Sequence, residues 1–269
     1  MSITMICEII LTFLQVLILA CGILFFMRRR RNSENAAFRA LFIFGLLNLL
    51  MCNLYWLAYD ILRPDLWMPI AADEIAEAAA NLLLAACLGI HMGKEKNKFH
   101  LPEFAFTFLY MMANASFWAI WSEEWIQSFL VAIPYIFLLY RTICGLNRSG
   151  AATKLQKVML LVPALLVIVL QYIRLTTDEE TALVLDHITY ALMPVSLLIL
   201  LYIFIKAKNS GSAAGGKRLY VSVLIYLWTM LCSFLSDGIF YSIALAETDL
   251  SLPLVFMAVA KEMPHDDLS

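Results

Sequence analysis

Residues 9–31 read IILTFLQVLILACGILFFMRRRR, an apolar run that ends in four consecutive arginines. A helix of about 20 apolar residues, rising about 1.5 Å per residue, spans the roughly 30 Å hydrocarbon core of a bilayer. Guanidinium groups are excluded from lipid and are retained on the cytoplasmic side of a membrane. No basic residue precedes the run, so it lacks the positive start of a cleaved secretory signal. The stretch therefore predicts a first transmembrane helix whose N-terminus is outside.

The composition of the whole chain agrees with a membrane protein. Hydrophobic residues make up 62% of the 269 residues and charged residues 15%, against about 45–50% and about 25% in soluble domains. A soluble fold of this length cannot cover so much apolar surface with polar groups. The net charge of −2 gives no indication of nucleic-acid binding. The sequence predicts an all-α, polytopic integral membrane helical bundle whose main partner is the lipid bilayer.

Short polar connections divide the chain into eight apolar segments, as in an antiparallel helical bundle. The predicted spans cover about residues 5–27, 38–62, 71–92, 101–121, 125–146, 155–173, 187–205 and 219–246. No segment is long and polar enough for a soluble domain, so residues 1–269 are predicted to form a single transmembrane domain. The apolar run Leu252–Ala260 is too short to cross a bilayer. Residues 250–269 are therefore predicted to form a short interfacial C-terminal tail.

The charged residues sort between the two sides of this predicted bundle. Of the 19 basic residues, 16 lie in connections that are expected to be cytoplasmic. The other three are Arg63, Arg174 and Lys261. The acidic residues on that basic side are three of 21, namely Glu34, Glu95 and Glu103. Each miscounted helix would invert everything after it, and the sorting would be lost. The charges therefore predict eight spans with the N-terminus and the C-terminus outside.

Two glycosylation sequons bear on the location of the protein. Asn114 begins one inside the fourth predicted span, and Asn147 begins another on the cytoplasmic side. Neither position is accessible to the glycosylation machinery of a secretory pathway. We therefore expect a multi-pass protein of the plasma membrane, specifically a bacterial inner membrane.

Ionisable side chains inside the predicted spans mark the candidate site, because each costs about 2.5–3.5 kcal/mol on insertion scales. Glu74, Glu77 and Asn81 stand at i, i+3 and i+7, on one face of the third span. Asp237 lies near mid-depth of the last predicted span, one turn before Tyr241. The candidate ligand-binding residues, nearly all in the outward halves of their spans, are Asp60, Glu74, Glu77, Asn81, Arg174, His187, Tyr190, Asp237 and Tyr241.

These residues predict an outward-facing acidic and aromatic cavity that binds, senses or transports a small solute. A cationic or amine-bearing solute suits it, because carboxylates attract a cation and aromatic faces add about 0.5–2 kcal/mol. The alternative interpretation is that Asp60 and Glu74 mark the water boundary and that tyrosines at span ends belong to the interfacial belt. Arg174 is equally compatible with a structural ion pair and with a contact to a solute.

Motifs for metal or cofactor chemistry are missing from the sequence. It contains no H-E-x-x-H, C-x-x-C, G-x-S-x-G or G-x-x-x-x-G-K-[ST] pattern. No metal site and no cofactor are predicted, and a non-enzymatic function is favoured. The identity of the solute, a coupling ion and the oligomeric state stay open, and a homo-oligomer is compatible with the sequence.

Two short segments each place an aspartate after an apolar helix: YWLAYDIL at 55–62, with Asp60, and SFLSDG at 233–238, with Asp237. The pair resembles the paired aspartates of eight-span lysoplasmalogenase-like lipid hydrolases, although Tyr59 stands where that family has glycine. The resemblance covers about 14 residues of the chain. It implies an alternative function, an intramembrane lipid-processing hydrolase in which Asp60 and Asp237 carry out general acid–base chemistry on a bound water.

Overall fold

The described parts of the chain are helices joined by short turns. The computed structural model describes residues 3–29, 36–62, 72–93, 99–101, 103–105, 107–109, 125–149, 154–206, 214–236 and 238–263. The helices are α1 (Ile3–Arg28), α2 (Ala36–Leu62), α3 (Ala72–Met92), α5 (Trp125–Ser149), α6 (Lys154–Arg174), α7 (Glu179–Lys206), α8 (Ala214–Phe234) and α9 (Gly238–Glu262). The predicted all-helical class is confirmed for these residues. Of the predicted fourth span, the described residues from 101 to 109 are helical, and the rest lies outside the described residues.

The end of the chain differs from the prediction. The single span expected over residues 219–246 is two helices, α8 and α9, which pack against each other. The break falls at the sequence Ser236-Asp237-Gly238, and Gly238 has a φ of 57°. Glycine adopts this left-handed conformation without the steric cost of a Cβ, so it permits a tight turn between two helices. Residues 251–262 therefore continue α9, whereas the sequence placed them in a tail after the last span.

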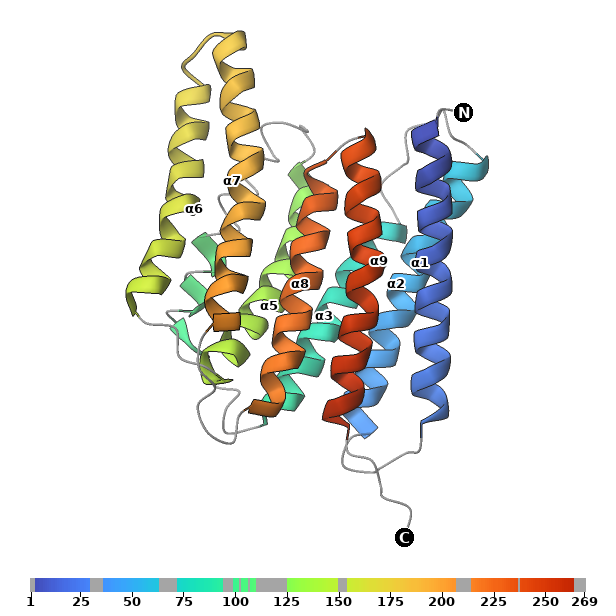
Figure 1. Cartoon of the computed structure of the whole chain (residues 1–269). Helices are drawn as coiled ribbons and strands as arrows, with labels where there is room; N and C mark the ends of the chain where they lie inside the picture. Colours follow the sequence, from blue (N-terminus) through green and yellow to red (C-terminus); the bar gives the residue numbers. More distant parts are fainter. Residues whose placement is uncertain are drawn as a thin grey trace.

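Because α9 is a separate helix, the end of the chain lies at the other end of the bundle from where it was predicted. The C-terminal end of α9 lies beside the C-terminal end of α1, opposite to the N-terminus (Figure 1). Nη2 of Arg29 lies 2.9 Å from the backbone oxygen of Met263 and donates a hydrogen bond to it. Lys261 thus joins the other basic residues instead of lying across the bundle from them. We call this end, where α1 and α9 finish, the basic end, and the opposite end, where α3 begins with Asp73 and Glu74, the acidic end.

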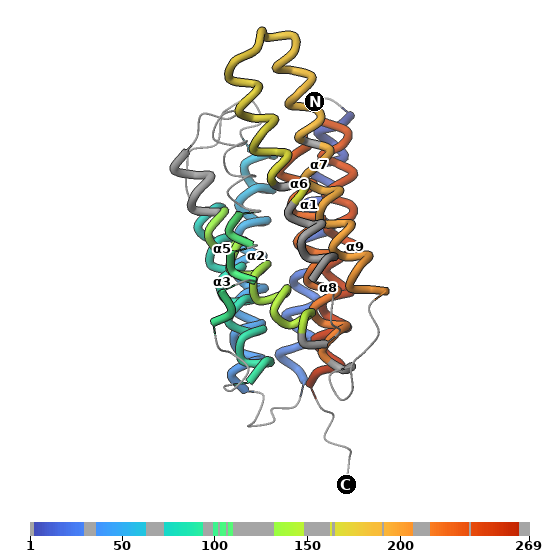
Figure 2. Tube along the Cα trace, turned by 90° about the vertical axis from the view of Figure 1, so that its left-hand side faces the viewer, coloured from blue at the N-terminus to red at the C-terminus, as the bar shows by residue number. Residues whose placement is uncertain are grey.

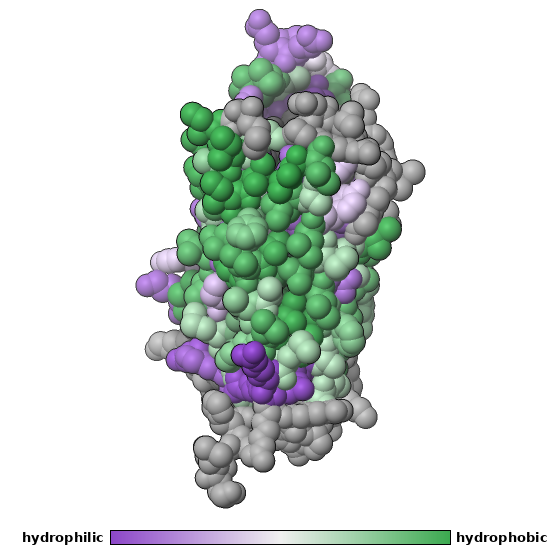
Figure 3. All heavy atoms as spheres, turned by 90° about the vertical axis from the view of Figure 1, so that its right-hand side faces the viewer, coloured by the Kyte–Doolittle hydropathy of each residue, from purple (hydrophilic) through white to green (hydrophobic). Residues whose placement is uncertain are grey.

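Five of the described helices are long and apolar enough to cross a membrane: α1, α2, α3 (from Asp73), α7 and α9. Figure 3 views the bundle from the α1 side and shows a broad apolar belt with hydrophilic residues gathered toward both ends. On α1 the exposed apolar side chains include Ile10, Phe13, Leu17 and Leu24. Soluble monomers rarely expose a continuous apolar surface of this size. The helices are therefore compatible with a membrane-embedded protein.

Six helices close into a ring. The neighbouring pairs are α1–α2, α2–α3, α3–α5, α5–α8, α8–α9 and α9–α1. In Figure 1, α8, α9 and α1 form the front of this ring, and α5, α3 and α2 lie behind them. Helix α7 packs on the outside of α8, and α6 packs on α7. Figure 2 shows the α6–α7 hairpin rising beyond the other helices at the acidic end.

Close packing joins α5 to α8 at mid-depth and near the basic end. The hydroxyl of Tyr135 on α5 donates a buried hydrogen bond to the carbonyl of Leu227 on α8, at 2.7 Å. Gly145 on α5 leaves room for the ring of Tyr220 on α8, since a Cβ there would lie 2.2 Å from a ring carbon. Because these contacts leave no space for larger groups, α5 and α8 have a defined register.

Candidate functional site

Three helices of the ring each carry a buried polar side chain at mid-length. Gln15, Asn81 and Asp249 stand within one residue of the midpoints of α1, α3 and α9. Their exposed fractions are 7%, 0% and 5%. A buried polar group needs a hydrogen bond or another partner to offset its lost hydration. Polar groups in these positions therefore mark the interior of the ring as the place to search for a site.

The register of α1 and α9 puts Gln15 and Asp249 at about the same level of the bundle. The two helices pack side by side and run in the same direction (Figure 1). The ring of Phe256 lies directly over Gly22. Seven residues are about two helical turns, so the residues seven positions earlier lie on the same faces and at a common level. Those residues are Gln15 and Asp249, and a further seven positions earlier are Glu8 and Ser242.

These four residues form what we call the polar seam, consisting of Glu8 and Gln15 on α1 with Ser242 and Asp249 on α9. It follows the α1–α9 interface from near the acidic end to mid-depth. Beyond it, toward the basic end, the interface is apolar, at Gly22 and Phe256. Within the described residues, both carboxylate oxygens of Asp249 are buried without a hydrogen-bond partner. No ion pair joins Asp249 to a basic side chain in this part of the chain.

A proline adds a second polar group at the same place. Pro253 stands inside α9, four residues after Asp249. Proline has no N–H, so the backbone carbonyl of Asp249 lacks its usual helical donor at i+4. Carboxylate and carbonyl oxygens at mid-helix are the kinds of ligand with which interrupted membrane helices hold cations.

Helix α3 contributes a second row of polar groups. Asp73, Glu77 and Asn81 are spaced by four residues and share one face. In the described structure, Oδ1 of Asp73, Oε1 of Glu77 and both amide atoms of Asn81 are buried without hydrogen-bond partners. Asp73 and Glu74 are electrostatic neighbours of Glu77 on the same helix.

The Glu77 carboxyl faces the interior of the ring. It interacts electrostatically with Cys52 of α2, Tyr226 of α8 and Tyr241 of α9. A side chain that reaches three other helices of a ring must point toward its centre. The spacing of Glu77 and Asn81 on α3 and the position of Tyr241 thus bring three predicted site residues toward a common interior.

Near the acidic end, Asp60 and Glu8 lie close enough to interact electrostatically, and both also interact with Tyr241. The predicted residue Asp237 directly follows the last described residue of the α8–α9 turn and lies outside the described residues. Carboxyl groups therefore extend from Glu8 and Asp60 at this end to Glu77 and Asp249 at mid-depth.

Aromatic side chains fill the other half of the interior. The rings of Phe26, Phe42 and Phe256 meet edge to face, with centroids 4.9–6.3 Å apart. Closer to the basic end, Nε2 of His91 on α3 lies 3.7 Å from Oε2 of Glu262 on α9. The ring of His91 also contacts Tyr220, at 5.9 Å between centroids. The interior is polar toward the acidic end and closed by packed rings toward the basic end.

The predicted residues of α6 and α7 lie elsewhere. Nε of Arg174 is 2.7 and 2.9 Å from the two carboxylate oxygens of Asp186, so Arg174 pairs with a neighbouring helix. His187 is exposed, and its Nδ1 lies 2.7 Å from the carbonyl of Leu183. The side chain of Tyr190 is outside the described part of the structure. The hairpin packs on the outside of α8, so Arg174 and His187 do not line the ring interior with Glu77.

Sequence reasoning missed Gln15 and Asp249. The last predicted span ended at residue 246 and left Asp249 outside the candidate site, and Gln15 stands inside an apolar run. The turn sequence Ser236-Asp237-Gly238 was the signal that could have placed Asp249 at the middle of a separate helix. In the described residues, no group of three or more His, Cys, Asp or Glu side chains is arranged to hold a metal ion.

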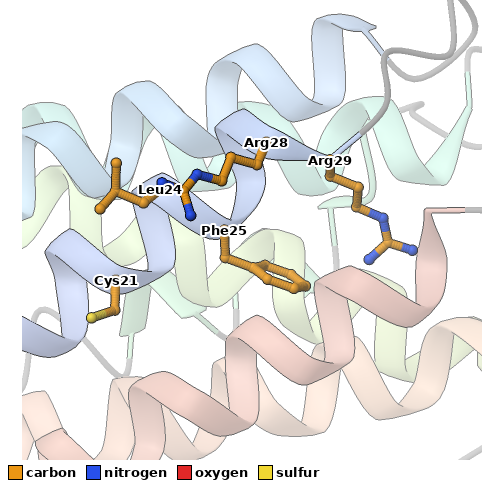
Figure 4. A pocket seen from close by; sticks show the side chains of 5 residues that line it. All are labelled: Cys21, Leu24, Phe25, Arg28 and Arg29. Atoms are coloured by element: carbon orange, nitrogen blue, oxygen red, sulfur yellow. The ribbon is translucent and has the colours of Figure 1, made fainter.

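A groove lies on the outer surface of the ring, between α1 and α9. Its apolar part has a volume of about 470 Å³ and is lined by Leu17, Ile18, Cys21, Gly22, Phe25, Pro253, Phe256, Met257 and Ala260. A second hollow of about 600 Å³ has all of its described lining residues on α1 and at its end: Cys21, Leu24, Phe25, Arg28 and Arg29. Figure 4 shows Phe25 and Arg29 directed toward α9, and Arg28 running back along α1 toward Leu24.

The fold and the site together define a helical bundle, with helices of membrane-spanning character, whose ring of six helices encloses acidic and amide side chains. Comparison of the chain with known protein families, curated proteins and solved structures finds no match. The function is therefore argued from the site alone.

Proposed function

We propose that this is a multi-pass protein of the cell membrane that binds a small cationic or amine-bearing solute in the acidic interior of the six-helix ring. The observation that carries the proposal is Asp249, whose two carboxylate oxygens are buried at mid-helix without a partner among the described residues. An isolated carboxylate in a medium of low dielectric is costly unless a cation or a proton neutralises it.

The distribution of charge favours a cation over an anion. Glu8, Asp60, Glu77 and Asp249 contribute to the seam and the interior, and Arg174 is held outside by Asp186. Like charges on walls of low dielectric focus a field that raises the local concentration of the opposite charge. Tyr226 and Tyr241, which interact with Glu77, add aromatic groups suited to an ammonium head.

In this proposal the solute enters the interior from the acidic end, where the polar residues lie. By the positive-inside rule the basic end faces the cytoplasm, so the solute enters from outside. The rings of Phe26, Phe42 and Phe256 block the other half. A receptor needs no opening there, whereas a transporter would have to separate these rings, so binding or sensing is the simpler function for this arrangement.

Thermal unfolding of the purified protein in detergent tests the proposal. Sodium, choline and putrescine chlorides are compared at equal ionic strength. A ligand present at about 100 times its Kd stabilises the folded state by about 2.7 kcal/mol. We expect one cation to raise the Tm saturably. Equal, non-saturating shifts with all three salts would contradict the proposal.

Two variants connect such a shift to the interior. Asp249→Asn is expected to fold, because removing a buried charge removes its desolvation cost, and to lose the cation-dependent shift. Asp178→Asn is the matched control, because Asp178 is an exposed aspartate in the turn between α6 and α7. A shift that survives both Asp249→Asn and Glu77→Gln would place the cation elsewhere.

The resemblance to lysoplasmalogenase-like hydrolases supplies the competing function. It predicts release of the head group from a lysolipid by the purified protein and loss of this activity in Asp60→Asn. Asp60 and Glu8 lie close enough to interact electrostatically. Two neighbouring carboxyl groups suit a cation site as well as they suit acid–base catalysis. Turnover that depends on Asp60 would replace the binding function with the enzymatic one.

A further inference from the structure

We infer that the groove between α1 and α9 is a binding site for an anionic phospholipid, with an acyl chain along the groove and the phosphate at Arg28 and Arg29. This site lies on the outer surface of the ring and does not depend on the cation site proposed for its interior.

The two parts of the groove share lining residues on α1. Cys21 and Phe25 line both the apolar part and the part that contains the arginines. From Leu17 to Arg29 the lining follows α1 for 12 residues, which is about 18 Å of helix. One leaflet of a bilayer has a hydrocarbon thickness of about 15 Å. The groove is thus long enough to hold the acyl chain of one leaflet from its middle to its surface.

Small residues at the base of the groove account for its depth. Gly22 has no side chain, and Phe256 lies over it, so α1 and α9 approach closely at this level. Pro253 and Ala260 are compact, whereas Phe25 and Met257 stand at the rim and are exposed by 52% and 56%. A depression between rims of this kind accepts a flexible chain.

The arginines Arg28 and Arg29, at the basic end of the groove, favour an anionic head group. Arg29 is held in place, because its guanidinium donates to the carbonyl of Met263 at the end of α9. Arg28 is exposed and makes no hydrogen bond or ion pair with the described residues. The nearest acid on α9, Glu262, is paired with His91. Guanidinium groups bind phosphate oxygens through charge-assisted hydrogen bonds.

A phosphate bound at these arginines would therefore complete the site. A zwitterionic lipid offers the same phosphate but carries a cation that the arginines repel. A free phosphate offers the same charge but leaves the apolar part of the groove empty. Only an anionic phospholipid meets both parts.

The test measures binding of phosphatidylglycerol with a fluorescent acyl chain to the full-length protein in neutral detergent, with labelled phosphatidylcholine in parallel. We expect phosphatidylglycerol to bind more tightly. Arg28→Gln should weaken its binding about fivefold, since a basic residue near an anionic lipid contributes about a factor of this size. The matched control is Arg218→Gln, an exposed arginine at the basic end of α8, which should leave binding unchanged.

A second pair of variants tests the acyl-chain part. Cys21→Trp fills the point that the two parts share and should abolish tight binding without altering the charge. Cys7→Trp changes another exposed cysteine of α1, 14 residues earlier and on nearly the same face, and should have no effect.

Three results would overturn the inference. Equal affinity for the two lipids, unchanged in Arg28→Gln, would show unspecific contact with surrounding lipid. Full competition by glycerol 3-phosphate with no effect of Cys21→Trp would show a site for soluble phosphate. Loss of binding in Arg218→Gln to the same extent as in Arg28→Gln would show a general effect of surface charge.

Discussion

The ring of Phe256 occupies the space in which Gly22 would carry a side chain: a Cβ on Gly22 would lie 2.4 Å from Cε2 of Phe256. This one contact aligns α1 with α9. Two turns toward the acidic end, the same alignment places Gln15 at about the level of Asp249. On the outer surface it forms the floor of the groove that leads to Arg28. The polar seam and the groove therefore share a register that a single glycine permits.

We expect Gly22→Ala to lower the stability of the protein. The added methyl group overlaps the Phe256 ring, and overpacking of this kind costs about 1–3 kcal/mol. The measurement is the Tm in detergent. Gly45→Ala is the control, because its Cβ would meet Leu84 at an ordinary 3.4 Å. The double variant Gly22→Ala with Phe256→Leu should recover part of the loss, and no recovery would contradict the overlap as its cause.

The ion pair between Arg174 and Asp186 is expected to hold the α6–α7 hairpin without affecting the ring interior. Nε of Arg174 reaches both carboxylate oxygens of Asp186, which is 5% exposed. Removing the carboxylate charge of Asp186 leaves the partly buried guanidinium of Arg174 without its ion pair, at a cost of about 1 kcal/mol. Asp186→Asn should lower the Tm while any cation-dependent shift in Tm is retained. If Asp186→Asn abolished that shift, the Arg174–Asp186 pair would contribute to the cation site.

The start of α7 should depend on pH. Thr181 donates two hydrogen bonds to the Asp178 carboxylate, from its hydroxyl at 2.9 Å and its N–H at 3.3 Å. The hydroxyl bond is the larger cause that lowers the pKa of Asp178 below its ordinary value of 3.8. A lowered pKa in the folded state stabilises the fold at pH values above the unfolded pKa, and this contribution is lost as the pH falls through the folded pKa.

The first turn of α7 should therefore fray only in acid, below about pH 4. Hydrogen exchange of the amides at residues 179–182, followed against pH, measures this opening. In Thr181→Ala the carboxylate loses its larger hydrogen bond, so the opening should begin at a higher pH. An unchanged profile in that variant would show that Thr181 does not set the pKa of Asp178.

The sequence predicted most of the helices because lipid imposes one strong rule, that long apolar segments form helices with internally satisfied backbones. The same rule failed at the last helix for a physical reason. It treats charges as markers of the water boundary, whereas Asp249 is a charge buried at the middle of α9. The missed helix α9 and the missed site residue Asp249 thus have the same cause.

In the candidate site, too, the sequence predicted what depends on one helix and not what depends on the packing between helices. Helical spacing alone aligned Glu77 with Asn81, because both stand on one helix. Whether Arg174 and His187 would join them depended on how α6 and α7 pack, and no local pattern contains that information. Asp249 and Gln15 share a level through the register of two helices that are distant in the sequence, at the place where Gly22 and Phe256 pack.

The number of helices gives the most direct test of the fold. Eight spans would put Lys261 on the side of the N-terminus, whereas the structure has it in the last turn of α9, at the basic end, two residues before the Met263 carbonyl that binds Arg29. Single cysteines are introduced at Ile3, Thr177 and Lys261 in a variant without the native cysteines, and whole cells are treated with a thiol reagent that cannot cross the membrane. We expect labelling at positions 3 and 177 and protection at position 261, because α9 returns the chain to the basic side. Labelling at position 261 from outside would remove α9 from the membrane, and with it the polar seam and the lipid groove that α9 forms with α1.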